Sequence, residues 1–278
     1  MSTNPLIAAY RKPALYISLP SGGRFYNPKP TLSIDGELAI YPMTARDELI
    51  TKTPDALYNG EATRALIKSC CPDIQDADQV PMSDLIVILL AIRTASYGNE
   101  LDIDVKCPSC QSMNMLTVDS PTILASAKSV TAETSVELSQ GFIVDIKPFN
   151  LHDRTLLQLQ QVKQQRLIQS LMSQSNMEDA ERNEIFGKTF VEIAELTVDL
   201  VANCVAGVTI PDSEVITDQD MIHEWLKSIS REDYEKIRDR VEELGQSGIN
   251  NNMKARCQEC GHEWTTEVEL DMSNFFAG

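Results

Sequence analysis

Two CxxC pairs, placed far apart in the chain, constrain the fold more than any other feature. The first pair is Cys107 and Cys110, and the second is Cys257 and Cys260. Each pair has the spacing of a zinc knuckle, in which a tight turn directs two thiolates at one metal. A simple zinc ribbon separates its pairs by about 15–20 residues, whereas just over half of this chain lies between the two pairs. A single metal would therefore clamp a long insertion at its base.

Alternating apolar residues flank both pairs, as in the arms of β-hairpins. These apolar residues are Leu101, Ile103 and Val105 before the first pair, Met113 and Met115 with Leu116 or Val118 after it, and Trp264, Val268 and Leu270 after the second. The sequence therefore predicts a split zinc ribbon whose structural Zn²⁺ is held by Cys107, Cys110, Cys257 and Cys260. Four thiolates leave no open position on the metal, so chemistry at this site is not expected.

Other interpretations of the four thiols stay open. They are two separate weak sites, four free thiols on turns, or a disulfide within a CxxC, although no thioredoxin-like βαβ pattern surrounds either pair. His262 follows the second pair and is expected to pack rather than to act as a fifth ligand. Seven cysteines, an odd number, favour a reducing compartment and a metal over disulfides. Cys70, Cys71 and Cys204 are predicted to be buried and unreactive.

The net charge of −17, from 24 basic and 41 acidic residues, limits the classes of partner. A duplex-binding protein needs a cationic surface that displaces counterions, and the predicted hairpins carry more acidic than basic residues. No run of 18 apolar residues exists, so no membrane span is expected. We therefore expect partners that are proteins, with no nucleic acid, no membrane and no small-molecule substrate.

Hydrophobic periodicity predicts an α+β protein that is mainly helical, with an N-terminal β-hairpin and a split zinc ribbon that encloses a helical insertion. The N-terminal hairpin is expected around Asp35-Gly36, with arms at Leu32 and Ile34 and at Leu38 and Ile40. The predicted parts are an extended arm and β-hairpin (1–43), a helical N-terminal body (44–100), the zinc ribbon (101–120 plus 254–272), the insertion (121–253) and a tail (273–278).

Several strings, in this order, resemble the T4-type bacteriophage base plate protein family. They are LPSGGRFY (19–26), YPMTARDE (41–48), IRTASYGNELD (92–102), CPSC (107–110) and CQECGHEW (257–264), with a closing Phe275-Phe276. The similarity spans most of the chain and is sharpest in 19–119. It implies a structural or assembly protein of a contractile-tailed phage baseplate, associated with the hub. It also implies other baseplate or tail proteins as partners, and a location in the virion or, during assembly, in the host cytoplasm.

Arg24, Phe25 and Tyr26 are candidate partner-binding residues because Arg and Tyr are common at interface hot spots. The alternative is an N-terminal arm that packs on its own chain. No GxSxG, HExxH or dinucleotide fingerprint is present, and His152-Asp153 is predicted to start a helix. The protein is therefore expected to be non-enzymatic. The alternatives are a zinc-ribbon protein that binds nucleic acid or acts in transcription, and a redox or metal-dependent enzyme.

Overall fold

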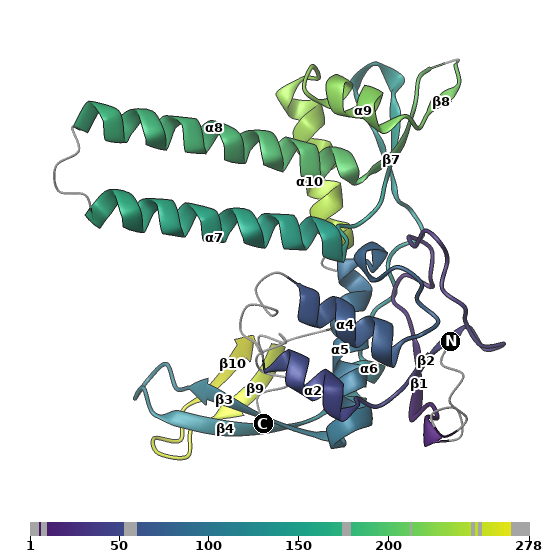
Figure 1. Cartoon of the computed structure of the whole chain (residues 1–278), viewed down its shortest axis with the longest axis vertical. Coiled ribbons are helices and arrows are strands. Elements are labelled where there is room, and N and C mark those ends of the chain that lie inside the picture. The colour runs from purple at the N-terminus through teal and green to yellow at the C-terminus, as the bar shows by residue number, and fades with distance from the viewer. Residues whose placement is uncertain are drawn as a thin grey trace. The chain divides into compact units, whose positions relative to one another are not determined.

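The computed structural model describes residues 6, 10–52, 60–173, 179–211, 213–245, 248–249 and 252–267 (Figure 1). The predicted tail (273–278), with Phe275-Phe276, and the end of the predicted ribbon (268–272) lie outside these residues. The chain divides into two units. Unit 1 comprises 1–130 and 247–278, and unit 2 comprises 131–246. Both CxxC pairs belong to unit 1, and unit 2 lies within the predicted insertion.

Helix α5 (Met82–Tyr97) is the central element of unit 1. Its sequence is apolar nearly all round, which is typical of a helix that is buried rather than amphipathic. Nine of its residues are buried, including Leu85, Ile88 and Leu90 at 0% exposure. Loss of one such side chain to alanine costs about 2–5 kcal/mol, so α5 carries a large share of the stability of this unit.

The N-terminal β-hairpin is formed by β1 (Leu15–Ser18) and β2 (Glu37–Ile40), which pair antiparallel. The prediction of an N-terminal hairpin is confirmed, but its first arm was placed wrongly at Leu32 and Ile34. Ile34 is fully exposed, and the Thr31 N–H donates to the Asp73 carbonyl at 3.1 Å. Only Ser33 reaches β2 from this segment, through its N–H to the Glu37 carbonyl at 2.8 Å. The strand that pairs with β2 is therefore β1, and a long loop, which includes the turn at Asp35-Gly36, joins the two strands.

Three short helices and one 3₁₀ turn complete the helical part of unit 1 among the described residues. Thr44 and Asp47 form a capping box at the start of α2, as the S/T-x-x-E/D pattern predicts. The remaining elements are α2 (Ala45–Thr51), α4 (Glu61–Cys70), the 3₁₀ turn η1 (Ala77–Gln79) and α6 (Ser120–Ala125). Leu66, Ile67 and Cys70 of α4 are fully buried, which is the apolar stripe expected of an amphipathic helix.

Unit 2 is built on an antiparallel sheet of order β5-β6-β7-β8. The strands are β5 (Ser135–Glu137), β6 (Ile143–Ile146), β7 (Val205–Thr209) and β8 (Val215–Ile216). The 3₁₀ turn η2 (Ser139–Gly141) joins β5 to β6, and α9 (Gln219–Leu226) and α10 (Arg231–Gly245) complete the unit. The buried side chains of this unit include Val144, Ile146, Val208, Ile222, Leu226, Ile237, Val241 and Leu244.

Two long helices, α7 (Leu151–Ser173) and α8 (Asp179–Asn203), join β6 to β7. They form an antiparallel pair that extends away from the sheet of unit 2 (Figure 1). The Asp153 N–H donates to the Asn150 side-chain oxygen at 3.0 Å, and the Asn150 N–H donates to the Asp153 carboxylate at 3.3 Å, so the two residues cap the start of α7. The prediction that a helix starts at His152-Asp153 is confirmed. Among the described residues, no helix is long and apolar enough to span a membrane.

Candidate metal centre

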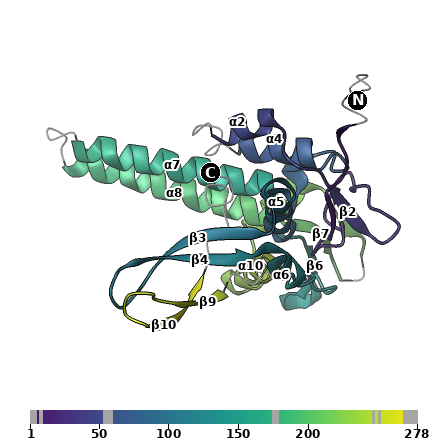
Figure 2. The ribbon, with the colours of Figure 1, turned by 90° about the horizontal axis from the view of Figure 1, so that it is seen from below.

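Each CxxC pair lies in the turn of a two-stranded antiparallel hairpin. The first hairpin joins β3 (Glu100–Lys106) to β4 (Met113–Asp119), and the second joins β9 (Asn252–Arg256) to β10 (Glu263–Glu267). The two hairpins lie side by side (Figure 2). The alternation of apolar residues that predicted the β3 strand is confirmed, because Leu101, Ile103 and Val105 are all buried.

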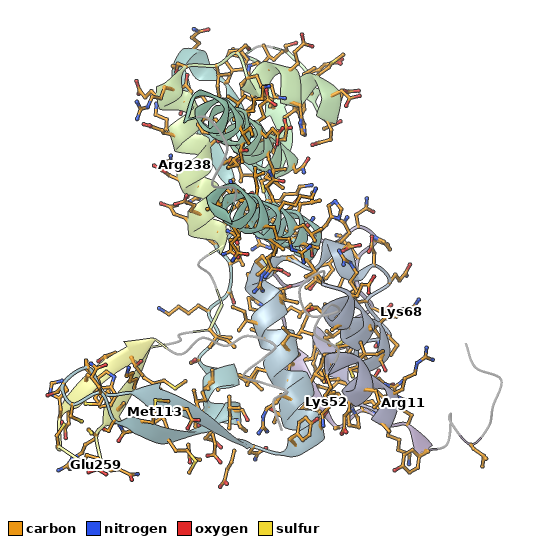
Figure 3. All side chains as sticks on the ribbon, turned by 60° about the vertical axis from the view of Figure 1, so that its left-hand side comes forward. Arg11, Lys52, Lys68, Met113, Arg238 and Glu259 are labelled. Carbon is orange, nitrogen blue, oxygen red and sulfur yellow. The ribbon has the colours of Figure 1, made fainter. Side chains whose placement is uncertain are left out.

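The inward face of β4 differs from the prediction. The register pairs Val105 with Asn114, and cross-strand partners lie on the same face of a sheet. Asn114 is therefore buried, while Leu116 and Val118 are half-buried. Met113 and Met115, the residues predicted to face inward, are 63% and 61% exposed. Figure 3 shows Met113 on the first hairpin and Glu259 in the turn of the second. The prediction was wrong because the knuckle turn, and not the apolar pattern, sets the register.

The two turns have the same backbone geometry. In each turn, the backbone N–H of the first cysteine donates to the carbonyl of the residue five positions later. The backbone carbonyl of the same cysteine accepts the N–H of the residue that follows the second cysteine. The bonds are Cys107 N–H to Ser112 C=O (2.9 Å) and Gln111 N–H to Cys107 C=O (3.0 Å), matched by Cys257 N–H to His262 C=O (2.9 Å) and Gly261 N–H to Cys257 C=O (3.0 Å). The residue after each pair is left-handed, with φ of 64° at Gln111 and 72° at Gly261. Only the second turn uses the glycine that this conformation favours.

The four cysteine sulfurs converge on one point. All four Sγ atoms lie within 4.8 Å of one another, with Cys107 to Cys260 at 3.8 Å and Cys110 to Cys257 at 3.5 Å. A tetrahedral site with metal–thiolate bonds of about 2.3 Å requires sulfurs about 3.8 Å apart. The donor set therefore fits a four-coordinate metal ion with two ligands from each hairpin. Cys107 and Cys257 are buried, whereas Cys110 and Cys260 are exposed.

Ser112 and Asn114, which the sequence did not single out, connect the two hairpins around the sulfurs. The Ser112 hydroxyl lies 3.0 Å from the Cys110 sulfur and 3.2 Å from the Cys257 sulfur. The Asn114 amide contacts the Cys257 sulfur at 3.7 Å, and its carbonyl accepts the Gln258 N–H at 2.9 Å. Such outer partners orient metal ligands. In the sequence, Asn114 could be identified only as a polar residue at an inward-facing position of β4. That position is recognisable only once the strand register is known.

Hydrogen bonds to sulfur favour the thiolate form that metals bind. The Ser112 hydroxyl, followed by the Cys260 backbone N–H, lowers the pKa of Cys257 to about 5, and Ser112 also lowers the pKa of Cys110. The backbone N–H of His262 favours the thiolate of Cys260, but the neighbouring Cys110 sulfur and burial outweigh it and raise that pKa to about 11. Four crowded thiols do not ionise together without a cation, because like charges disfavour one another.

The other cysteines and His262 behave as predicted. Burial raises the pKa of Cys70 to about 12 and also raises the pKa of Cys71 and Cys204. All three side chains are fully buried, which fits unreactive packing residues. The His262 ring stacks on Trp264, with centroids 6.0 Å apart and planes 11° apart.

The candidate partner-binding residues lie in a loop that wraps the start of α5. Tyr26 is 5% exposed, and its hydroxyl donates to the buried Asp84 carboxylate at 2.9 Å. Ser21 donates to the same carboxylate through its N–H and its hydroxyl, and burial raises the pKa of Asp84. Arg24 is exposed, and its guanidinium donates to the Val130 carbonyl at 2.8 Å and lies 5.2 Å from the Phe25 ring. The loop therefore contacts its own chain through Tyr26 and Arg24, and Phe25 is half-exposed.

Comparison with known proteins gives one family. The family model described as "T4 bacteriophage base plate protein" matches residues 17–277, nearly the whole chain. No curated protein and no solved structure matches the chain. The matched range includes both hairpins of the metal site and all of unit 2.

Proposed function

Because the chain belongs to the T4 bacteriophage base plate protein family, we propose that it is a structural or assembly component of the hub region of a contractile-tailed phage baseplate. It acts through contacts with other baseplate or tail proteins, in the virion and, during assembly, in the host cytoplasm. The family supports the structural role in the baseplate and its location in the tail. The hub region is the finer assignment, and it rests on the resemblance of the strings in 19–119.

The metal in this proposal is a structural Zn²⁺ held by Cys107, Cys110, Cys257 and Cys260. The observation that carries it is the convergence of four sulfurs within 4.8 Å from two hairpins that lie far apart in sequence. Four-thiolate tetrahedral sites are typical of structural zinc. With every position taken by protein, the ion supplies folding free energy and no Lewis-acid chemistry at a substrate. A non-enzymatic role follows.

The zinc site would act by fixing the base of the insertion. Since β4 leads towards unit 2 and β9 leads back from it, zinc binding fixes the two chain ends between which unit 2 is inserted. A fixed base limits the conformational entropy that the insertion loses when a partner binds it. Zinc therefore prepares two protein-binding surfaces, one on each unit, for assembly.

The acidic face of the first hairpin argues against the competing function of nucleic-acid binding. The outward positions of β3 and its neighbour on β4 carry Glu100, Asp102, Asp104 and Asp119, with Lys106 as the one base of β3. A phosphate backbone would be repelled by this face. The chain is therefore expected to give no salt-dependent shift of duplex DNA or single-stranded RNA in a gel.

The test uses the phage in which the chain is encoded. Mass spectrometry of purified particles is expected to find the chain at a fixed stoichiometry to other baseplate proteins if it is a virion component. If it is an assembly factor, it is found instead in baseplate intermediates from infected cells. Absence from both would contradict the proposed function.

A matched pair of substitutions connects the zinc site to this role. Cys257→Ser removes a ligand, whereas Cys204→Ser alters a buried cysteine of unit 2 that is outside the site. Complementation with Cys257→Ser is expected to yield few complete tails, and Cys204→Ser is expected to yield more than Cys257→Ser. Equal yields of complete tails from Cys257→Ser and the unaltered chain would contradict a role of zinc in assembly, but would not contradict the proposed role in the baseplate.

A further inference from the structure

The outer part of the α7–α8 hairpin has no buried core. On α7 from Leu156 to Gln169, and on α8 from Ile185 to Asp199, no described side chain is buried. Burial begins only at the base of the hairpin, with Thr155 on one helix and Leu200 on the other. Most helical stability in proteins comes from packing of an apolar face. The apolar residues in this outer part therefore lack that kind of burial among the described residues.

One stripe of half-buried residues runs along each helix, and we assign it to the side that faces the other helix. These stripes are Leu156, Gln160 and Leu167 on α7, and Ile185, Thr189 and Leu196 on α8. Both sets recur at i, i+4 and i+11, the spacing of one face of a helix. Other apolar residues of the two helices, among them Leu157, Ile168 and Ile193, lie outside these stripes and are half-buried or exposed.

A second stripe lies about 90° further round each helix, at about 100° per residue, and it contains no charged residue. On α7 it is Leu157, Gln161, Gln164 and Ile168, and on α8 it includes Ile193 and Thr197. The sequence has Phe186 and Phe190 at the two preceding positions of this spacing, although their side chains lie outside the described part. Because the helices are antiparallel, the same rotation in the chain direction brings both stripes to one side of the hairpin, here called the uncharged side.

The opposite side of the hairpin carries the charges. They are Lys163 and Arg166 on α7, and Lys188, Glu192 and Glu195 on α8. From Leu156 to Ser173 the only charges of α7 are basic, whereas from Ile185 to Asp199 α8 carries one base and three acids. The hairpin is therefore amphipathic as a two-helix layer, with one side suited to solvent and the other suited to further helices.

We propose that the uncharged sides of two copies of this chain pack face to face, across a two-fold axis parallel to the helices, as a four-helix bundle. In this arrangement each α7 lies beside the α8 of the other copy, and like helices lie on the diagonals. The sides in contact carry no charge, so the association buries no charged side chain and brings no like charges together. The 4-3-4 spacing of the α7 stripe is the 3.5-residue repeat of helices that pack in bundles.

The available area fits a stable dimer. From Leu156 to Ser173, α7 is about 27 Å long at about 1.5 Å per residue. The facing halves of two helices about 11 Å in diameter offer roughly 900 Å² per copy over that length. Specific interfaces bury about 800 Å² per partner. The self-complementary surface is isologous, so the assembly closes as a dimer and does not propagate.

The chain offers a matched pair of residues for the test. Ile168 and Leu159 are both 39% exposed on α7, but Ile168 lies on the uncharged side and Leu159 on the charged side. Sedimentation equilibrium of the full chain is expected to show a monomer–dimer equilibrium. Ile168→Glu is expected to weaken the dimer at least about tenfold, because each interface buries the new charge twice. Leu159→Glu is expected to change it less than threefold.

Two outcomes would overturn the proposal. One is a wild-type chain that stays monomeric up to about 100 μM, which would mean that another protein or no protein covers the uncharged side. The other is a dimer that Ile168→Glu leaves unchanged, or that Leu159→Glu weakens as much. Helix content from circular dichroism is measured for each variant, and Gln161→Glu repeats the test at a second position of the uncharged side if Ile168→Glu fails to fold.

Discussion

The hairpins of the metal site and the outer half of the α7–α8 hairpin are both thin layers that bury few side chains of their own. The β-hairpins bring four sulfurs within 4.8 Å of one another, so one ion can complete them inside a single chain. The helical pair has no described cluster of ligands, and instead has an uncharged side of helical spacing. The two regions are therefore expected to be stabilised in different ways, the β-hairpins by a metal ion and the helical pair by packing against further helices.

Removal of the metal is the largest expected perturbation, and it separates the two regions. Structural zinc supplies about 10–16 kcal/mol of apparent binding free energy in zinc-finger peptides, which is folding free energy for the element concerned. Incubation with a chelator is expected to abolish amide protection in β3, β4, β9 and β10. Helix α5, which has nine buried residues, and the α7–α8 hairpin are expected to keep theirs. Hydrogen exchange with mass spectrometry measures both regions in one sample.

Acid is expected to have the next largest effect on the β-hairpins. The folded-state pKa of Cys257 is about 5, below the ordinary value of about 8.5. The stabilisation from this thiolate is therefore complete above about pH 8.5 and is lost as the pH falls through about 5. Because protons compete with the metal for the thiolates, zinc is expected to be released on acidification, and a chromogenic chelator detects it. Release that is already complete at pH 7 would be inconsistent with hydrogen-bonded thiolates.

Asn114 tests how much of the contact between the hairpins is independent of the metal. Asn114→Ala leaves the Gln258 N–H without its acceptor and the Cys257 sulfur without a donor. Loss of such buried bonds costs about 1–3 kcal/mol, and loss of an outer partner weakens metal affinity about 10–100-fold. Competition with a zinc dye and thermal unfolding measure the two effects. Met113→Ala, at the neighbouring exposed position, is the control and is expected to change neither.

The smallest predicted effect compares the two knuckle turns with each other. Gly261 has φ of 72° and no atom within 4 Å of an added Cβ, so Gly261→Ala costs only the left-handed conformation, about 1–2 kcal/mol. Gln111 is already in this left-handed conformation, with φ of 64°, so the folded protein already includes that destabilisation at this turn. Gln111→Gly is therefore expected to raise stability by less than about 1 kcal/mol, partly offset by the added freedom of the unfolded chain. Chemical denaturation of both variants measures the free energy of unfolding and shows whether the left-handed position costs the same in the two turns.

Much of the site could be predicted from sequence because its signals are local. CxxC spacing is a property of one turn, and the two turns do share their backbone bonds and bring the four sulfurs together. Alternation of Leu101, Ile103 and Val105 likewise predicted β3. Apolar periodicity also predicted a helical insertion between the two pairs, and the structure has the long helices α7 and α8 in that part of the chain.

The errors have one physical origin, which is register between segments. β4 turned Asn114 inward and Met113 outward because the knuckle fixes the number of residues between the strands. β2 paired with β1, some twenty residues earlier, and not with the adjacent segment at Leu32 and Ile34. The Tyr26 hydroxyl donates to Asp84, a contact that no local pattern in the sequence encodes, and the role of Tyr26 in partner binding stays a prediction.

The claim that one metal ion closes the split ribbon is tested most directly by metal content per chain. Elemental mass spectrometry of the purified wild-type protein is expected to give one zinc per chain. The double variant Cys257→Ser/Cys260→Ser is expected to give none, although Cys107 and Cys110 remain, because two thiolates from one hairpin do not complete the site. Two metals per wild-type chain, or a metal retained by either hairpin after loss of the other pair, would contradict the account.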